Sequence, residues 1–159
     1  MAKVLLLISL CWLFCSGHQF KAEKVWLFSK KQYGGNTPVR APGQQPKGPT
    51  SLLLCFLEIK KGDAIPAWDS AYLNGRKFSI VTQSVSQDSI IVGTIQNTKM
   101  PAVIKPDAGY QVINLLLEQE GDDGKAKDEG FVLKGHTGKK GEFLQSTQPA
   151  VELMPDMMP

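Results

Sequence analysis

Cysteine is scarce in this chain, and its scarcity excludes a fold held together by disulfides. Three cysteines occur among 159 residues, and two of them, Cys11 and Cys15, lie within the first 17. Without that N-terminal segment Cys55 would be the sole thiol, and no disulfide could form within the chain. Because its neighbours are leucines and a phenylalanine, we expect Cys55 to be a small buried apolar side chain rather than a reactive thiol.

A strong charge of one sign and a long apolar run are also missing. The chain has 18 lysines and arginines and 15 acidic residues, a net charge of +3. A nucleic-acid-binding protein usually has a clustered basic face and a much higher pI, so we expect no nucleic-acid partner. Residues 4–14, apolar except for Ser9, form the longest apolar stretch, whereas a membrane-spanning helix needs about 20 such residues. We therefore expect no membrane-spanning segment.

The N-terminus has the three parts of a secretory signal. Lys3 provides the positive charge, residues 4–14 provide the apolar core, and Gly17 provides a small residue at the cleavage site. We predict a signal peptide over residues 1–17, a mature chain that begins at His18, and a secreted or periplasmic location. The mature 142 residues (159 minus 17) are enough for one packed domain without disulfides.

Short apolar runs separated by turn residues indicate an all-β fold. Strand-like runs occur at residues 23–29, 51–60, 68–73, 76–82, 88–96, 131–134 and 142–145. About seven short strands predict a single antiparallel β-sandwich over residues 18–159, immunoglobulin-like or jelly-roll-like, with at most one short helix. Residues 109–120 leave that helix open. Their leucines and glutamates suit a helix ending at Gly121, while Val112 and Ile113 favour a strand.

Turn chemistry indicates one tight hairpin and two irregular segments. Asn74-Gly75 lies between two strand-like runs and predicts a two-residue turn in which Leu73 faces Arg76. Residues 30–50 contain four glycines, four prolines, four basic residues and no acid, so we expect a basic loop. From about residue 148 onward, three prolines predict a frayed tail.

Two basic surfaces are candidates for binding a partner. One lies within the basic loop, and the other lies at the glycine-rich tip of a second predicted hairpin. Basic side chains clustered in this way attract acidic proteins, anionic glycans or lipid headgroups. The candidate ligand-binding residues are Arg40 and Lys47 in the loop and His136, Lys139 and Lys140 at the tip.

Two patterns suggest metal binding. The acidic segment 118–129 lacks the spacing of an EF-hand, so we expect a solvated loop, with a calcium site as the alternative. If cleavage follows Gly17, the α-amino group and imidazole of His18 could chelate copper together with His136. This arrangement resembles the histidine brace of secreted polysaccharide monooxygenases that have a β-sandwich fold. The resemblance implies a copper-dependent oxidase.

These observations favour an exported binding or scaffold module without catalysis and without a resident cofactor. Its partner would be an unidentified protein or glycan, and self-association through exposed strand edges is a further hypothesis. The alternative is the secreted copper oxidase that uses His18 and His136. The sequence has no G-x-S-x-G motif, which excludes the nucleophile elbow of the α/β-hydrolases.

Overall fold

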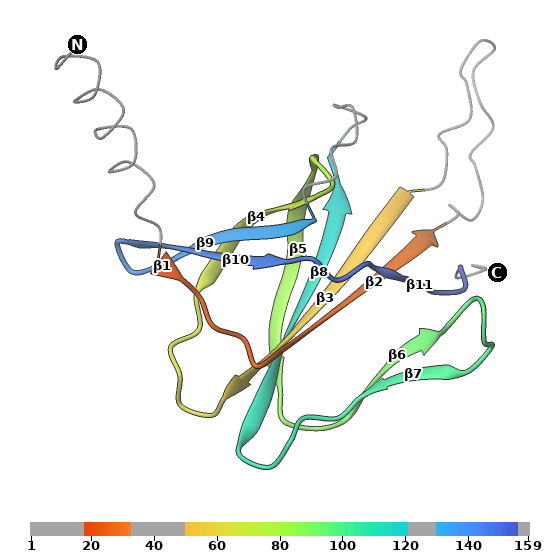
Figure 1. The fold of residues 1–159 in the computed structure, drawn as a ribbon, viewed down its shortest axis with the longest axis horizontal. Helices are drawn as coiled ribbons and strands as arrows, with labels where there is room; N and C mark the ends of the chain where they lie inside the picture. The colour runs from red at the N-terminus through yellow and green to blue at the C-terminus, as the bar shows by residue number, and fades with distance from the viewer. Residues whose placement is uncertain (1–17, 33–49, 121–129, 156–159) are drawn as a thin grey trace, which may run out of the picture.

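The computed structural model describes residues 18–32, 50–120 and 130–155, and these residues form strands and turns without a helix (Figure 1). The strands are β1 (His18–Gln19), β2 (Lys24–Gln32), β3 (Thr50–Lys60), β4 (Ala67–Leu73), β5 (Arg76–Ser86), β6 (Ile90–Thr94), β7 (Pro101–Ile104), β8 (Tyr110–Gln119), β9 (Phe131–Thr137), β10 (Lys140–Ser146) and β11 (Val151–Glu152). The predicted all-β class is confirmed.

Nine of these strands form one curled sheet in the order β1-β10-β9-β4-β5-β8-β3-β2-β11 (Figure 1). All neighbours are antiparallel except the outermost pairs, β1 with β10 and β11 with β2, which are parallel. Residues 20–23 join β1 to β2, and residues 147–150 join β10 to β11. Each short outer strand therefore lies at one edge of the sheet and is connected along the chain to a strand next to the opposite edge.

The core lies on both faces of this sheet because side chains alternate along each strand. On β3, Leu53, Cys55 and Leu57 face the inside of the curl, where the larger buried cluster lies. Leu54 and Phe56 face the other way. There the β6–β7 hairpin covers the outer face of the sheet (Figure 1). The cluster beneath the hairpin consists of Phe28, Phe56, Ala102, Ile104, Val112 and Leu153.

The arrangement of the strands differs from the predicted sandwich. The described residues form one curled mixed sheet of nine strands and a two-stranded sheet, so two antiparallel sheets packed face to face are not confirmed. These residues contain eleven strands in place of about seven. The physical reason is that alternation of apolar residues shows which side chains face a core. It does not show which distant strands pair.

The predictions for the Asn74-Gly75 turn and for Cys55 are confirmed, and the open choice between helix and strand at residues 109–120 is decided. Leu73 pairs with Arg76 across a turn in which Asn74 and Gly75 have φ values of 51° and 80°. Residues 109–120 contain a strand, because β8 is paired with β3 on one side and β5 on the other. Backbone pairing on both edges outweighs the helical preference of its leucines. The predicted buried environment of Cys55 is also confirmed, and burial raises the pKa of its thiol.

The C-terminal segment does not fray from residue 148 as predicted. Val151 and Glu152 pair with β2, and the Leu153 side chain is only 1% exposed. The Leu153 amide donates to the Ser29 carbonyl at 2.8 Å, and the Met154 amide donates to the Thr94 carbonyl at 2.8 Å. This segment therefore joins β2 to the end of β6, which no local signal in a proline-rich sequence indicates.

We expect Leu153→Ala to lower the free energy of unfolding by about 2 kcal/mol, at the lower end of the range for buried leucines. The loss is moderate because a segment near the chain end can partly close the space that the side chain leaves. Urea denaturation followed by circular dichroism measures it. Met154→Ala, which removes a side chain that is 39% exposed, is the control and should change little. Equal unfolding midpoints for the two variants would contradict the packing of Leu153.

Candidate functional site

A pocket of about 400 Å³ opens at the end of the curl where β2 ends, β3 begins and the β4–β5 turn lies. Its volume is within the range of small-molecule sites, about 300–1,000 Å³. Its lining comes from β2, β3, β4, β5, β8 and β11 and the β4–β5 turn. The lining residues are Ser29, Lys30, Lys31, Ser51, Leu52, Leu53, Leu73, Asn74, Arg76, Phe78, Gln119 and Glu152.

The floor of the pocket is apolar because it is the end of the interior core. Leu53 is 1% exposed and Phe78 is 5% exposed, and Leu73 packs against the same cluster. Phe78 pairs with Gln119 of β8, so the amide of Gln119 lies beside the aromatic ring on the inner face. The floor can therefore contact a hydrocarbon group, and polar side chains surround it.

The rim of the pocket is mainly cationic. Arg76 lies two residues before Phe78 on β5 and so faces the same side of the sheet. Lys31 pairs with Ser51 at the adjacent end of β2 and β3. Both cations are exposed, and neither forms an ion pair within residues 18–32, 50–120 and 130–155. Lys31 and Arg76, with the one carboxylate of Glu152, line the pocket, and the two cations favour an anionic group.

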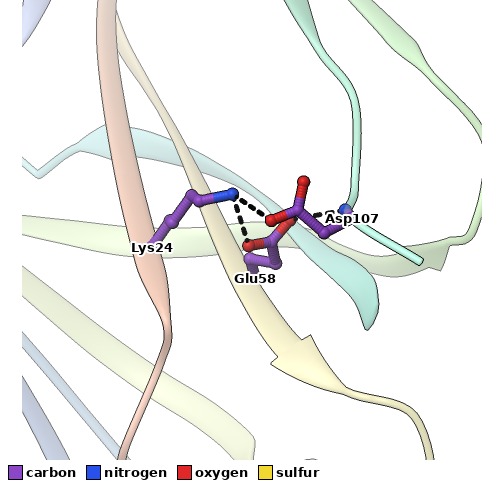
Figure 2. Close-up of polar contacts among 3 residues, drawn as sticks. All are labelled: Lys24, Glu58 and Asp107. Atoms are coloured by element: carbon purple, nitrogen blue, oxygen red, sulfur yellow. Dashed lines mark hydrogen bonds and ion pairs between the residues drawn. The ribbon is translucent and has the colours of Figure 1, made fainter. Parts of the chain in front are cut away.

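A second polar cluster lies outside the pocket, on the outer face of the sheet. Figure 2 shows Lys24 of β2, Glu58 of β3 and Asp107, which precedes β8, pointing toward one another. Lys24 Nζ lies 3.0 Å from Glu58 Oε2 and 2.7 Å from Asp107 Oδ2. The Asp107 amide donates to Glu58 Oε1 at 3.0 Å. The contact between Lys24 and Glu58 is an ion pair without the angles of a directed hydrogen bond.

This cluster holds three chain segments together. The side chain of Glu58 is fully buried, whereas Lys24 and Asp107 are 43% and 63% exposed. The hydrogen bond to Asp107 and then the contact with Glu58 raise the pKa of Lys24, so its ammonium group stays charged and is a poor nucleophile. The ammonium group compensates the buried carboxylate. We interpret the cluster as a structural anchor for the connection between β7 and β8.

The predicted hairpin tip lies far from the pocket. His136 pairs with Ala67 at the start of β4, whereas the pocket uses Leu73 at its end. His136 Nδ1 lies 3.0 Å from Asp69 Oδ2, and both side chains are about half exposed. Lys139 and Lys140 follow at the exposed turn. The structure therefore brings His136, Lys139 and Lys140 together, at the opposite end of β4 and β9 from the pocket.

The structure does not bring together the two histidines proposed for copper. His18 of β1 pairs with Glu142 of β10, and Glu142 pairs with Gly135 of β9. Paired residues share a face, so His18 shares a face with Gly135, and His136, the next residue, faces the other side. The described residues also contain no group of three or more histidines, cysteines or acids placed to hold a metal ion.

Other predicted site residues lie outside the described residues. Arg40 and Lys47 belong to the segment 33–49, and the central part of the acidic segment belongs to 121–129. Of the acids in this segment, Glu118 and Glu120 are described, and Glu120 forms an ion pair with Lys77 at 2.6 Å. That pairing raises the pKa of Lys77. The calcium alternative therefore stays a prediction.

Arg76 and Glu58 were missed by the sequence reasoning. Arg76 had a usable signal, because the Asn-Gly turn fixes a register that puts it on the same face as Leu73 and Phe78. Glu58 had no such signal in the sequence, because a lone acid near the end of an apolar run is usually solvated. Its burial depends on Lys24 and Asp107, which are distant in sequence.

Comparison with protein-family models, curated proteins and solved structures finds no match for this chain. Within the part of the chain that the structure describes, no helix is long and apolar enough to cross a membrane. The function of the candidate site must therefore be inferred from its own geometry and chemistry.

Proposed function

We propose that this protein is an exported, non-catalytic binding module whose ligand enters the pocket between β2, β3 and the β4–β5 turn. The observation that supports this most is the placement of Lys31 and Arg76 beside an apolar floor in a space of about 400 Å³. Binding is proposed rather than catalysis because cations, amides and hydroxyls next to apolar side chains are groups that hold a ligand. The signal-like sequence of residues 1–17 supports export.

The chemistry of the pocket indicates a small amphiphilic anion. A guanidinium group donates two parallel hydrogen bonds to a carboxylate or phosphate, and a lysine adds charge. The side chains of Leu53, Leu73 and Phe78 would contact the apolar part of the same molecule. A medium-chain carboxylate has both parts, and octanoate is a convenient probe.

We expect Arg76→Gln to weaken octanoate binding about 10-fold or more, because hydrogen bonds to charged groups contribute about 1.5–3 kcal/mol. Lys31→Gln should weaken it less, because a flexible ammonium group loses more side-chain entropy on binding. Isothermal titration calorimetry measures both dissociation constants. The neutral analogue 1-octanol should bind the wild type and Arg76→Gln with similar affinity, since it lacks the anionic group.

Lys139→Gln and Lys140→Gln are the matched controls, because they remove the same charge at the far end of β4 and β9. Both should bind octanoate as the wild type does. If Arg76→Gln retains wild-type affinity and an intact circular dichroism spectrum, the pocket is not the binding site. If only the two control variants lose affinity, the ligand binds at the hairpin tip instead.

A further inference from the structure

A buried carboxylate with one unpartnered oxygen lies in β10. Glu142 is 8% exposed, and its Oε2 atom has no hydrogen-bond partner. Within residues 18–32, 50–120 and 130–155 no cation forms an ion pair with it. Removing a carboxylate oxygen from water costs free energy unless a hydrogen bond or a positive group compensates it. The fold therefore has a place for a cation beside Glu142.

The neighbours of Glu142 in the sheet limit where that cation comes from. On one side lies Gly135 of β9, which has no side chain, and the indole of Trp68 packs against it. On the other side lies His18 of β1, in parallel register with Glu142. The amide of Phe20 donates to the carbonyl of Phe143 at 2.8 Å and so continues this pairing. Of the two residues beside Glu142 in the sheet, His18 is the one whose backbone nitrogen becomes a cation if the mature chain starts where the sequence predicts.

We propose that cleavage after Gly17 creates the missing partner, and that the new α-ammonium group of His18 forms an ion pair with Glu142. In the hydrolysis, catalysed by a signal peptidase, the peptide bond between Gly17 and His18 breaks. Water supplies the hydroxyl to the Gly17 carbonyl carbon and a proton to the His18 nitrogen. The resulting amine has an ordinary pKa of about 7.7–8.0 and carries a positive charge at neutral pH. In the uncleaved chain the same nitrogen is a neutral amide.

This ion pair would couple export to stability. Before cleavage Glu142 is buried without compensation, which lowers the stability of the folded precursor. After cleavage the ion pair strengthens the attachment of β1, the outermost strand at one edge of the sheet, to β10. The inference depends on the proposed export and not on the pocket, so a failure of octanoate binding leaves it unaffected.

The test compares three forms of the chain, with a free His18 terminus, with Gly17 retained, and with an acetylated His18 terminus. Each is made with Glu142 and with Glu142→Gln, and thermal unfolding is measured at pH 6.5. With Glu142 present, acetylation should lower the melting temperature by roughly 5 °C. Retaining Gly17 should also lower it, because one residue displaces the ammonium group by about 3.5 Å. With Glu142→Gln, acetylation should shift the melting temperature by about 1 °C or less, as expected for a coupled pair.

Glu152→Gln, which removes an exposed carboxylate from β11, is the matched control and should leave the effect of acetylation unchanged. An equal effect of acetylation with Glu142 and with Glu142→Gln would overturn the ion pair. If Glu142→Gln does not fold, NMR titration of the ¹³C-methylated α-amino group of His18 measures the pKa of that group and tests the ion pair without a mutation. A pKa above about 8.0 supports the pair, and an ordinary value overturns it. A secreted protein whose intact mass shows another N-terminus also overturns it.

Discussion

Replacing Gly135 with alanine should lower the free energy of unfolding by about 3 kcal/mol or more, because the new methyl group has no space. A Cβ atom at this position would overlap the carbonyl oxygen of Ala67 and lie 2.8 Å from the Trp68 ring and 2.9 Å from Trp68 Cα. Two of these three atoms belong to the backbone of β4, which pairs with β9 at this point. Relief of the overlap would therefore require separation of β4 from β9 and displacement of the buried indole.

Gly141→Ala is the control, because Gly141 pairs with His136 one residue away and a Cβ atom there meets nothing within 4 Å. Alanine at this position should change stability by about 0.5 kcal/mol or less. Urea denaturation monitored by tryptophan fluorescence measures both variants, and Trp68 reports directly on the disturbed contact. Unfolding midpoints that agree for the two alanine variants would show that Trp68 does not occupy the space above Gly135.

Replacing Lys24 with methionine should lower the melting temperature by roughly 10 °C, because it leaves Glu58 buried without a positive partner. The apolar stem of methionine preserves most of the packing of the lysine side chain, so the loss reports on the charge. Asp107 would also lose its ion pair at 2.7 Å and could no longer hold the β7–β8 connection against β2. Thermal unfolding followed by circular dichroism measures the change.

Lys77→Met is the matched control. Lys77 pairs with Glu120 at 2.6 Å, but these side chains are 48% and 41% exposed, so its removal should shift the melting temperature by only about 1 °C. Comparable shifts in the two variants would contradict the special role of the buried Glu58. A double replacement of Lys24 and Glu58 by methionine and leucine should recover part of the lost stability, since well-packed apolar groups can replace a buried ion pair.

The pH dependence of the Lys24 contribution follows from the direction of its pKa shift. Pairing raises the pKa of Lys24 above its ordinary value of 10.5, so the stabilising contribution is complete below pH 10.5. It is lost as the pH rises through the raised pKa. The difference in melting temperature between the wild type and Lys24→Met should therefore be constant near neutral pH and decrease only in strongly alkaline solution.

Much of the local structure was predictable from the sequence. The Asn74-Gly75 turn fixes the register of β4 and β5, because both residues accept positive φ and two-residue turns match the twist of the strands. The apolar surroundings of Cys55 predicted its burial for a similarly local reason. These features depend on residues close to one another in the chain, so the sequence contains most of the information that determines them.

The candidate site was predictable only in part. The sequence identified residues 30–50 as a basic loop, but Lys30 and Lys31 belong to the end of β2, which runs to Gln32. Their position beside Arg76 depends on β2, β3, β8 and β5 lying in that order in the sheet. No local pattern indicates this order, so the pocket could not be deduced from charge patterning. The partner and any self-association stay predictions.

By itself the sequence determined that this chain forms strands and that Cys55 is buried. Alternating apolar residues and turn signals are sufficient for these conclusions. Only the tertiary structure decided that the strands form a curled mixed sheet, that Leu153 anchors the C-terminal segment, and that Glu58 and Glu142 are buried. Pairing between distant strands sets these features, and its free energy comes from core packing and backbone hydrogen bonds across the whole chain.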